Sequence, residues 1–241
     1  MKSMKFRLIL EVLILVSFSS CSERISNITG SKFNEPSNGG FEKPKFQEQE
    51  TGPGLVLVEG GYFSSKENEE ILVPSFYMDI TEVTNHNWCE YLYWTKRVFV
   101  DYPLVYENVL PNELVWQENG VYNDPKVENY LRHPAYINYP VVGISWLQAN
   151  NFCAWRTDRV NENILIREGV LLENPNQQNE PFTTGAYLAG QYEQGLNYKK
   201  QMINYDPSAA SGRKKKDFGT RAVRIEDGIL LPRYRLPTAL E

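Results

Sequence analysis

The sequence predicts an α+β fold that is irregular and rich in loops. The apolar run at residues 55–58 is typical of a short strand, and the run at 141–144 is typical of a short buried strand. The stretches that follow Thr84 and Ser145 instead repeat apolar residues at the spacing of a helix. Proline and glycine interrupt both patterns at short intervals elsewhere. The chain should therefore combine short strands with two main helices and long connecting loops.

The rest of the chain is organised around residues 139–156, Tyr-Pro-Val-Val-Gly-Ile-Ser-Trp-Leu-Gln-Ala-Asn-Asn-Phe-Cys-Ala-Trp-Arg. Val141, Val142 and Ile144 suit a short buried strand. Ser145 and Gln148 form a Ser-x-x-Gln capping box, which starts a helix directly after that strand. We expect one face of this helix to be core, comprising Trp146, Ala149, Phe152, Cys153 and Val160.

A second strand-to-helix unit lies earlier in the chain. Residues 73–83 read as a strand and a turn that lead to Thr84 as the N-cap. Its helix should carry an apolar face at mixed three- and four-residue spacing, formed by Trp88, Cys89, Leu92 and Tyr93. Before this unit, we interpret Gly60-Gly61 as a tight hairpin turn, because two glycines are too few to form a phosphate-binding loop.

The first twenty residues have the features of an export signal. Lys2, Lys5 and Arg7 precede an apolar run at residues 8–16, which is too short to span a bilayer. Small residues then lead to Cys21, the position at which bacterial lipoproteins are cleaved and acylated. We predict a lipoprotein signal peptide over 1–20 with lipidation at Cys21. The alternative is an ordinary secretory signal followed by a chance cysteine.

Residues 21–54 are dominated by Ser, Asn, Gly, Pro, Glu and Lys and show no apolar pattern, so we predict a flexible tether. The folded domain should span 55–241.

The net charge is −5, and no basic face alternates with aromatic residues. Nucleic acid is therefore not an expected partner.

Residues 98–132 show no sustained period, and we expect turns and short strands there. Aromatic residues in such a segment more often pin it to the body than bind a ligand. They are Tyr102, Tyr106, Trp116, Tyr122 and Tyr130.

Four ordered motifs resemble the formylglycine-generating-enzyme-like, or sulfatase-modifying-factor, domain. They are Gly-Gly-Tyr-Phe at 60–63, Phe-Tyr-Met-Asp to Glu-Val-Thr-Asn at 76–85, Tyr-Pro-Val-Val-Gly-Ile-Ser-Trp at 139–146 and Arg-Leu-Pro-Thr at 235–238. The resemblance implies a C-type-lectin-related fold of which only the N-terminal half is present. In enzyme members the copper-binding cysteines follow the Arg-Leu-Pro-Thr motif, and this chain has no such half.

An insertion at about 158–232 separates the central helix from the last motif. We expect it to continue the helix over 158–172, then form a loop at 174–181 and a short helix within 182–191. The basic run at 213–216 reads as a solvated loop, with a patch for anionic lipid or an acidic partner as the alternative. The runs at 158–169, 185–193 and 224–232 are similar to the J-type gliding-motility lipoproteins of the Bacteroidetes, with the K type as second choice.

We predict no catalytic residues, no metal site and no cofactor. Cys89 and Cys153 suit small hydrophobes on the apolar side of helices. A disulfide between them is the alternative in an oxidising periplasm. His86 and His133 are 47 residues apart in the sequence and form no ligand motif by themselves.

Three functions remain open. The resemblance implies a non-catalytic scaffold of the gliding-motility and type IX secretion machinery, anchored in the outer membrane, facing the periplasm and contacting other proteins of that machinery. The alternatives are a periplasmic formylglycine-generating-type oxidase and a carbohydrate-binding module that uses aromatics such as Trp116 and Tyr122.

The end of the chain carries a helix-start signal, Thr238-x-x-Glu241. Because a helix cannot consist of its first turn alone, we expect a longer protein. We also expect apolar surface on this span and a frayed 238–241 end.

Overall fold

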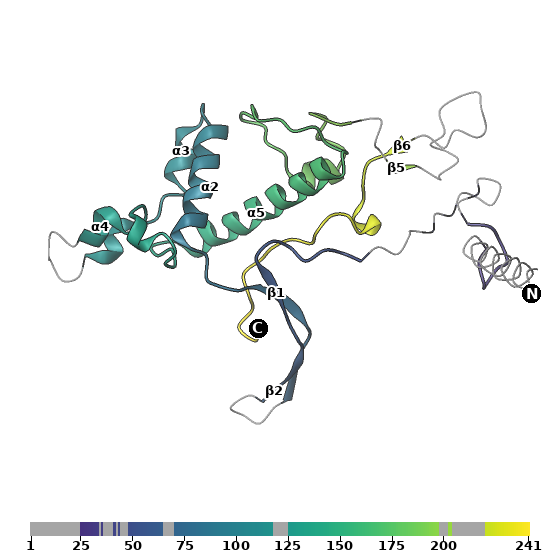
Figure 1. Cartoon of the computed structure of the whole chain (residues 1–241), viewed down its shortest axis with the longest axis horizontal. Coiled ribbons are helices and arrows are strands. Elements are labelled where there is room, and N and C mark those ends of the chain that lie inside the picture. The colour runs from purple at the N-terminus through teal and green to yellow at the C-terminus, as the bar shows by residue number, and fades with distance from the viewer. Residues whose placement is uncertain are drawn as a thin grey trace, which may run out of the picture. The chain divides into compact units, whose positions relative to one another are not determined.

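The computed structural model describes residues 25–33, 35, 41, 43, 48–64, 70–117, 125–197, 202–203 and 220–241 (Figure 1). It divides into two compact units. Residues 1–46 and 201–222 form the first unit. Its described part contains an isolated bridge between Ile25 and Lys32 and the antiparallel pair β5 (Met202–Ile203) and β6 (Thr220–Arg221). The predicted signal peptide, Cys21 and the basic run at 213–216 lie outside the described residues.

The second unit, residues 47–200 and 223–241, begins with a two-stranded antiparallel ribbon. Strand β1 (Leu55–Val58) pairs with β4 (Phe76–Asp79), and β2 (Gly61–Ser64) pairs with β3 (Glu70–Val73). Leu55 faces Asp79 in the first pair of strands, and Gly61 faces Val73 in the second, so the register continues from one pair into the other without a shift. The two pairs are therefore halves of one ribbon. The strand predicted at 55–58 is confirmed.

The predicted hairpin turn at Gly60-Gly61 is wrong. Gly60 lies at the break between the two halves of the ribbon, opposite Pro74, which has no N–H to donate to the ladder. The Gly60 N–H instead donates to Ser75 Oγ at 2.9 Å. A Cβ atom at Gly60 would lie 2.6 Å from the Val73 carbonyl oxygen. Glycine is needed here for close approach across the ribbon and not for a turn.

Helices α2 (Asn85–Val98) and α5 (Trp146–Arg167) form the centre of the unit (Figure 1). The predicted N-cap at Thr84 and the predicted capping box of Ser145 and Gln148 are confirmed. Thr84 Oγ1 accepts from the Asn87 N–H at 3.3 Å, and Ser145 Oγ accepts from the Gln148 N–H at 3.2 Å. The short polar side chains therefore fix the first residue of each helix.

The core lies where these two helices meet. Trp88 is fully buried, its ring stacks on Phe152 at 5.3 Å, and its indole N–H donates to the Val109 carbonyl at 3.1 Å. The full cluster of buried residues is Trp88, Tyr91, Leu92, Val109, Leu131 and Phe152. The sequence correctly placed Trp88, Leu92 and Phe152 in this core.

Two predicted core residues are on the surface. Trp146 is 74% exposed and Tyr93 is 71% exposed, whereas Tyr91 is buried. Trp146 is the first residue of α5, and helical side chains lean toward the N-terminus, so its ring extends past the end of the helix. The predicted role of Trp146 in the core is wrong.

Residues 141–144 do not form the predicted strand. Strand-like pairing is limited to an isolated bridge between Thr84 and Pro140. Gly143 adopts φ +76°, and its carbonyl accepts from the Asn112 N–H at 2.7 Å. A Cβ at Gly143 would lie 2.3 Å from the Asn112 carbonyl oxygen, so the chain turns there and only glycine fits.

The segment after α2 contains short helices where strands were expected. They are α3 (Pro103–Glu107), the 3₁₀ helix η3 (Glu113–Trp116), α4 (Pro125–Asn129) and the 3₁₀ helix η4 (Pro134–Tyr136). Three of them start at proline, which has no N–H to leave unpaired in a first turn. The prolines therefore start helices in this segment.

The elements predicted after residue 158 are found in part. Helix α5 ends at Arg167 and does not reach the predicted end at 172, whereas residues 174–181 form the expected loop and α6 (Thr184–Leu188) is the short helix expected within 182–191. A second aromatic group of Phe182, Tyr187 and Tyr192 packs beneath it, with ring centroids 5.2–5.8 Å apart. The last described 3₁₀ helix is η6 (Ile225–Asp227).

A buried ion pair joins this loop to the helices. Arg159 Nη1 lies 2.6 Å from Glu162 Oε2, and Arg159 Nη2 donates to the Phe182 carbonyl. The guanidinium also lies 4.6 Å from the Trp94 ring centroid, and Gln177 Nε2 donates to Glu162. We call these residues the Arg159 clamp.

The end of the described chain is ordered, contrary to the expected fraying. Thr238 and Glu241 form their capping box, with the Thr238 N–H donating to Glu241 at 2.9 Å. Arg235 holds both Glu241 oxygens, at 2.5 and 2.6 Å, and this pairing lowers the Glu241 pKa to about 2.

Within the described residues, no helix combines the length and apolarity that crossing a bilayer requires.

Tyr91 makes unfolding sensitive to alkaline pH. Burial raises its pKa from 10 to about 12, so the folded state keeps the hydroxyl protonated while the unfolded state ionises it near pH 10. The stability that this pKa difference contributes should be fully present below pH 10 and should decrease as the pH rises toward 12. We expect Tyr91→Phe to flatten this decline in urea titrations at pH 9–12. An unchanged pH slope in the variant would contradict the assignment.

Candidate functional site

The ribbon is the most prominent candidate interaction surface of the described residues. Side chains on both of its faces are exposed. The cross-strand partners Tyr62 and Leu72, at 73% and 63%, share one face, and Phe63, at 52%, lies on the other. Its exposed large apolar residues are Val56, Leu57, Val58, Tyr62, Phe63, Leu72 and Tyr77. Apolar patches of this kind are typical of surfaces that contact another protein.

The base of the ribbon is fixed to α5 by a bidentate ion pair. Arg156 Nη1 and Nη2 lie 2.5 and 2.7 Å from the two Asp79 oxygens, and Nη2 also donates to the Pro53 carbonyl. The Tyr234 ring lies 4.4 Å from the guanidinium carbon. The Tyr234 N–H donates to Thr157 Oγ1 at 2.9 Å, so the C-terminal segment is held to the same turn of α5. The ribbon is therefore held at its base by the ion pair and by the C-terminal segment.

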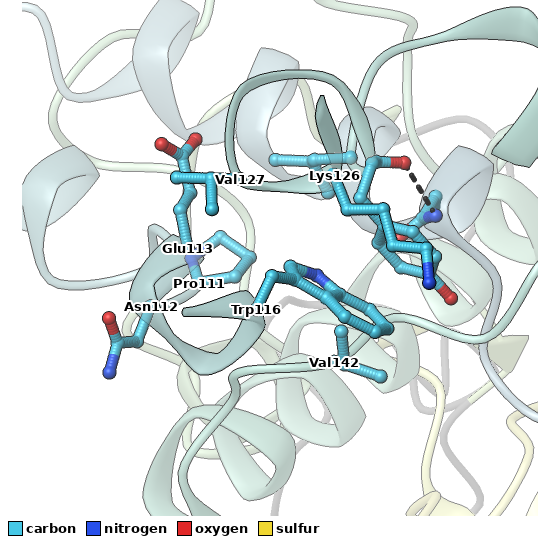
Figure 2. Close-up of a pocket in the computed structure, with 10 residues that line it drawn as sticks. Pro111, Asn112, Glu113, Trp116, Lys126, Val127 and Val142 are labelled. Carbon is cyan, nitrogen blue, oxygen red and sulfur yellow. Dashed lines mark hydrogen bonds between the residues drawn. The ribbon is translucent and has the colours of Figure 1, made fainter. Parts of the chain in front are cut away.

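A small pocket lies between α2, η3 and α4 (Figure 2). Its volume of about 10 Å³ is the size of one water molecule. Trp116 and Tyr130 form an aromatic wall with centroids 4.5 Å apart, and Lys126 Nζ lies 4.9 Å from the Trp116 ring centroid. Figure 2 shows Lys126 extending alongside the indole. A peptide or sugar does not fit this pocket as it stands.

The aromatics proposed for carbohydrate binding have different surroundings. Trp116 is half-buried and packs against Tyr130, which is 8% exposed and donates through its hydroxyl to the Pro140 carbonyl at 2.7 Å. These contacts join Trp116, Tyr130 and Pro140 to one another, so neither ring is free to stack on a ligand. Tyr122 lies outside the described residues. The geometry gives no exposed platform at Trp116 for stacking a sugar ring.

Cys89 and Cys153 are half-buried free thiols, so they do not form a disulfide with each other. Burial raises the pKa of Cys89, an effect partly offset by Arg132. Burial likewise raises the pKa of Cys153, partly offset by Arg156. Both thiols are protonated at neutral pH, which disfavours their use as nucleophiles or as thiolate ligands.

The two histidines serve local structure or lie on the surface. His133 caps η4, with Nδ1 accepting from the Ala135 N–H at 3.1 Å, and His86 is an exposed residue in the first turn of α2. Among the described residues, no three His, Cys, Asp or Glu side chains come together in a way that could hold a metal ion.

Sequence reasoning missed Asn85 as an important polar residue. It is fully buried, and its Nδ2 donates to the Tyr130 and Tyr136 carbonyls at 3.0 and 2.9 Å. Asn85 also lines the pocket. Its position at the end of the Glu-Val-Thr-Asn motif was the available signal, because a buried amide there joins segments 45 and 51 residues apart.

Comparison with known proteins identifies the domain. The sulfatase-modifying factor enzyme 1-like domain family matches residues 40–241. The chain is 29% identical over 135 residues to the inactive C-alpha-formylglycine-generating enzyme 2 of Mus musculus, covering 45% of this chain and 44% of that protein. It is 28% identical over 127 residues to the serine/threonine-protein kinase pkn1 of Chlamydia caviae, covering 47% of this chain and 18% of that protein.

The aligned segments thus span less than half the length of either curated relative. No solved structure matches the chain significantly. The family match covers most of the sequence and includes all four of the motifs that carried the resemblance. The chain therefore belongs to the sulfatase-modifying factor enzyme 1-like domain family.

Proposed function

We propose that this protein is a non-catalytic scaffold lipoprotein of the gliding-motility and type IX secretion machinery of the Bacteroidetes. Lipid on Cys21 holds it at the outer membrane, facing the periplasm, and residues 21–54 act as its tether. The J type of these lipoproteins is preferred and the K type is second. Support comes from the runs at 158–169, 185–193 and 224–232 and from a curated relative whose name marks it as inactive.

The exposed ribbon is the single observation that carries a scaffold role. A ribbon that is held at its base and carries seven large exposed apolar side chains suits contact with another protein. The raised thiol pKa values of Cys89 and Cys153 weigh against a formylglycine-type oxidase that uses them. The fold in this proposal is the C-type-lectin-related arrangement that the family resemblance implies.

The ribbon proposal is tested by charge substitution. Tyr62→Lys should abolish spreading of cells on agar and lower secretion, because a lysine prevents the apolar contact. Tyr93→Lys is the matched control, since Tyr93 is 71% exposed but lies on α2, and it should leave both activities unchanged. Normal spreading with Tyr62→Lys would remove the ribbon as the contact surface.

The anchor is tested by Cys21→Ala. Without the thiol there is no site for acylation, so we expect the protein to leave the outer-membrane fraction and to fail in restoring spreading to a deletion strain. Cys89→Ala is the control and should stay with the membrane. A Cys21→Ala protein that still sediments with the outer membrane would contradict lipid anchoring.

A further inference from the structure

We infer that the pocket beside Asn85 is a binding site for one water molecule, which donates a hydrogen bond to Asn85 Oδ1. Oδ1 is buried and makes no hydrogen bond with the protein. A buried amide oxygen without a donor costs free energy, so natural structures nearly always supply a partner.

The orientation of the Asn85 amide is fixed by its neighbours. The carbonyl oxygens of Tyr130 and Tyr136 can only accept, and both lie within 3.0 Å of the same amide atom. That atom must therefore be the nitrogen, which removes the usual ambiguity between the two ends of the amide. Oδ1 is therefore the buried atom that is left without a partner in the protein, and Asn85 is one of the residues that line the pocket.

The size of the pocket and the positive charge of the nearby Lys126 favour water over an ammonium ion as the bound molecule. A volume of about 10 Å³ admits a single water-sized molecule. Its apolar lining includes Val127, Val142 and Leu131, and the exposed residues Asn112 and Glu113 also line it. An ammonium ion has a similar size, but the Lys126 ammonium already lies 4.9 Å from the Trp116 ring centroid, and like charges repel. Water is therefore favoured.

Such a water would add a hydrogen bond to the contact between α2 and the segment that lines the pocket. Asn85 belongs to α2, whereas Tyr130 and Tyr136 flank the turn between α4 and η4. The pocket also takes in Pro111 and Trp116. The bound water thus connects the first turn of α2 with the segment 111–142.

A crystal structure of the full-length protein at better than about 2 Å, grown in sodium chloride, gives the direct test. We expect density for one water about 2.7–3.2 Å from Asn85 Oδ1. A second crystal soaked in ammonium chloride should look the same. Density only in ammonium would assign the site to a cation, and no density in either would show that the pocket is dry; both results would overturn the inference.

Filling the pocket gives an independent measurement. Val142→Ile adds a methyl group at the pocket wall and should displace the water, with loss of its density and a lower urea midpoint. Val160→Ile, on α5 and away from the pocket, is the control and should change neither. A raised midpoint for Val142→Ile would mean that the methyl fills a dry void, which would contradict the bound water.

Discussion

Replacing Trp88 by alanine should lower the free energy of unfolding by about 3–5 kcal/mol, a large part of the stability of a small domain. Trp88 is fully buried and contacts Tyr91 and Phe152 through its ring. The variant also leaves the Val109 carbonyl without its indole donor. Urea unfolding, followed by circular dichroism, measures the change.

Trp146→Ala is the matched control for this experiment. Trp146 has the same side chain but is 74% exposed, so its loss should change stability by only about 0.5 kcal/mol or less. Trp88→Phe should fall between the two variants because it keeps a ring in the core. Equal losses for Trp88→Ala and Trp146→Ala would mean that the core has been placed incorrectly.

Arg159→Ala should be about as damaging, with an expected loss of about 3–5 kcal/mol. The variant leaves the Glu162 carboxylate buried without its cation and frees the Phe182 carbonyl. Burial lowers the pKa of Arg159, which reflects the cost of holding this charge away from water. Thermal unfolding of the purified variants measures the effect.

The same helix supplies a control ion pair. Arg167 pairs with Glu50 at 2.7 Å, but its side chain is 57% exposed and the pair is screened by water, so Arg167→Ala should change stability little. We expect Arg159→Ala to increase proteolysis within 171–192 as the loop detaches, and Arg167→Ala to leave cleavage unchanged. A stable, protease-resistant Arg159→Ala protein would show that the Arg159 clamp is not needed.

Local signals in the sequence were sufficient to locate the helices. The caps at Thr84 and Ser145 depend on residues three positions apart, and both were found from the pattern alone. The prolines at 103, 125 and 134 carried a comparable signal, since proline is favoured at the first helical position. The sequence interpretation therefore missed the three short helical segments that begin at these prolines.

The remaining errors depend on contacts between distant segments. In the sequence, Gly60 and Gly143 look like ordinary turn residues. Their roles are set instead by backbone atoms that lie close to them, those of Val73 beside Gly60 and those of Asn112 beside Gly143. Trp146 fits the helical period and is exposed because it lies at the end of α5, where no neighbour covers its ring. Likewise, Arg159 and Glu162 were visible as an i,i+3 pair, but Gln177 and Phe182 could not be assigned to them from spacing alone.

The central claim, that the protein acts as a scaffold and not through catalytic thiols, is tested most directly by complementation. A deletion strain should be supplied with the double variant Cys89→Ala, Cys153→Ala, which keeps Cys21 for the anchor. Both thiols are half-buried, so alanine should be tolerated, and protein levels in the membrane fraction should be matched to wild type. We predict full recovery of spreading on agar. Failure to spread at matched protein levels, together with copper-dependent oxidation of a cysteine-containing peptide by the purified wild-type protein, would contradict the scaffold role.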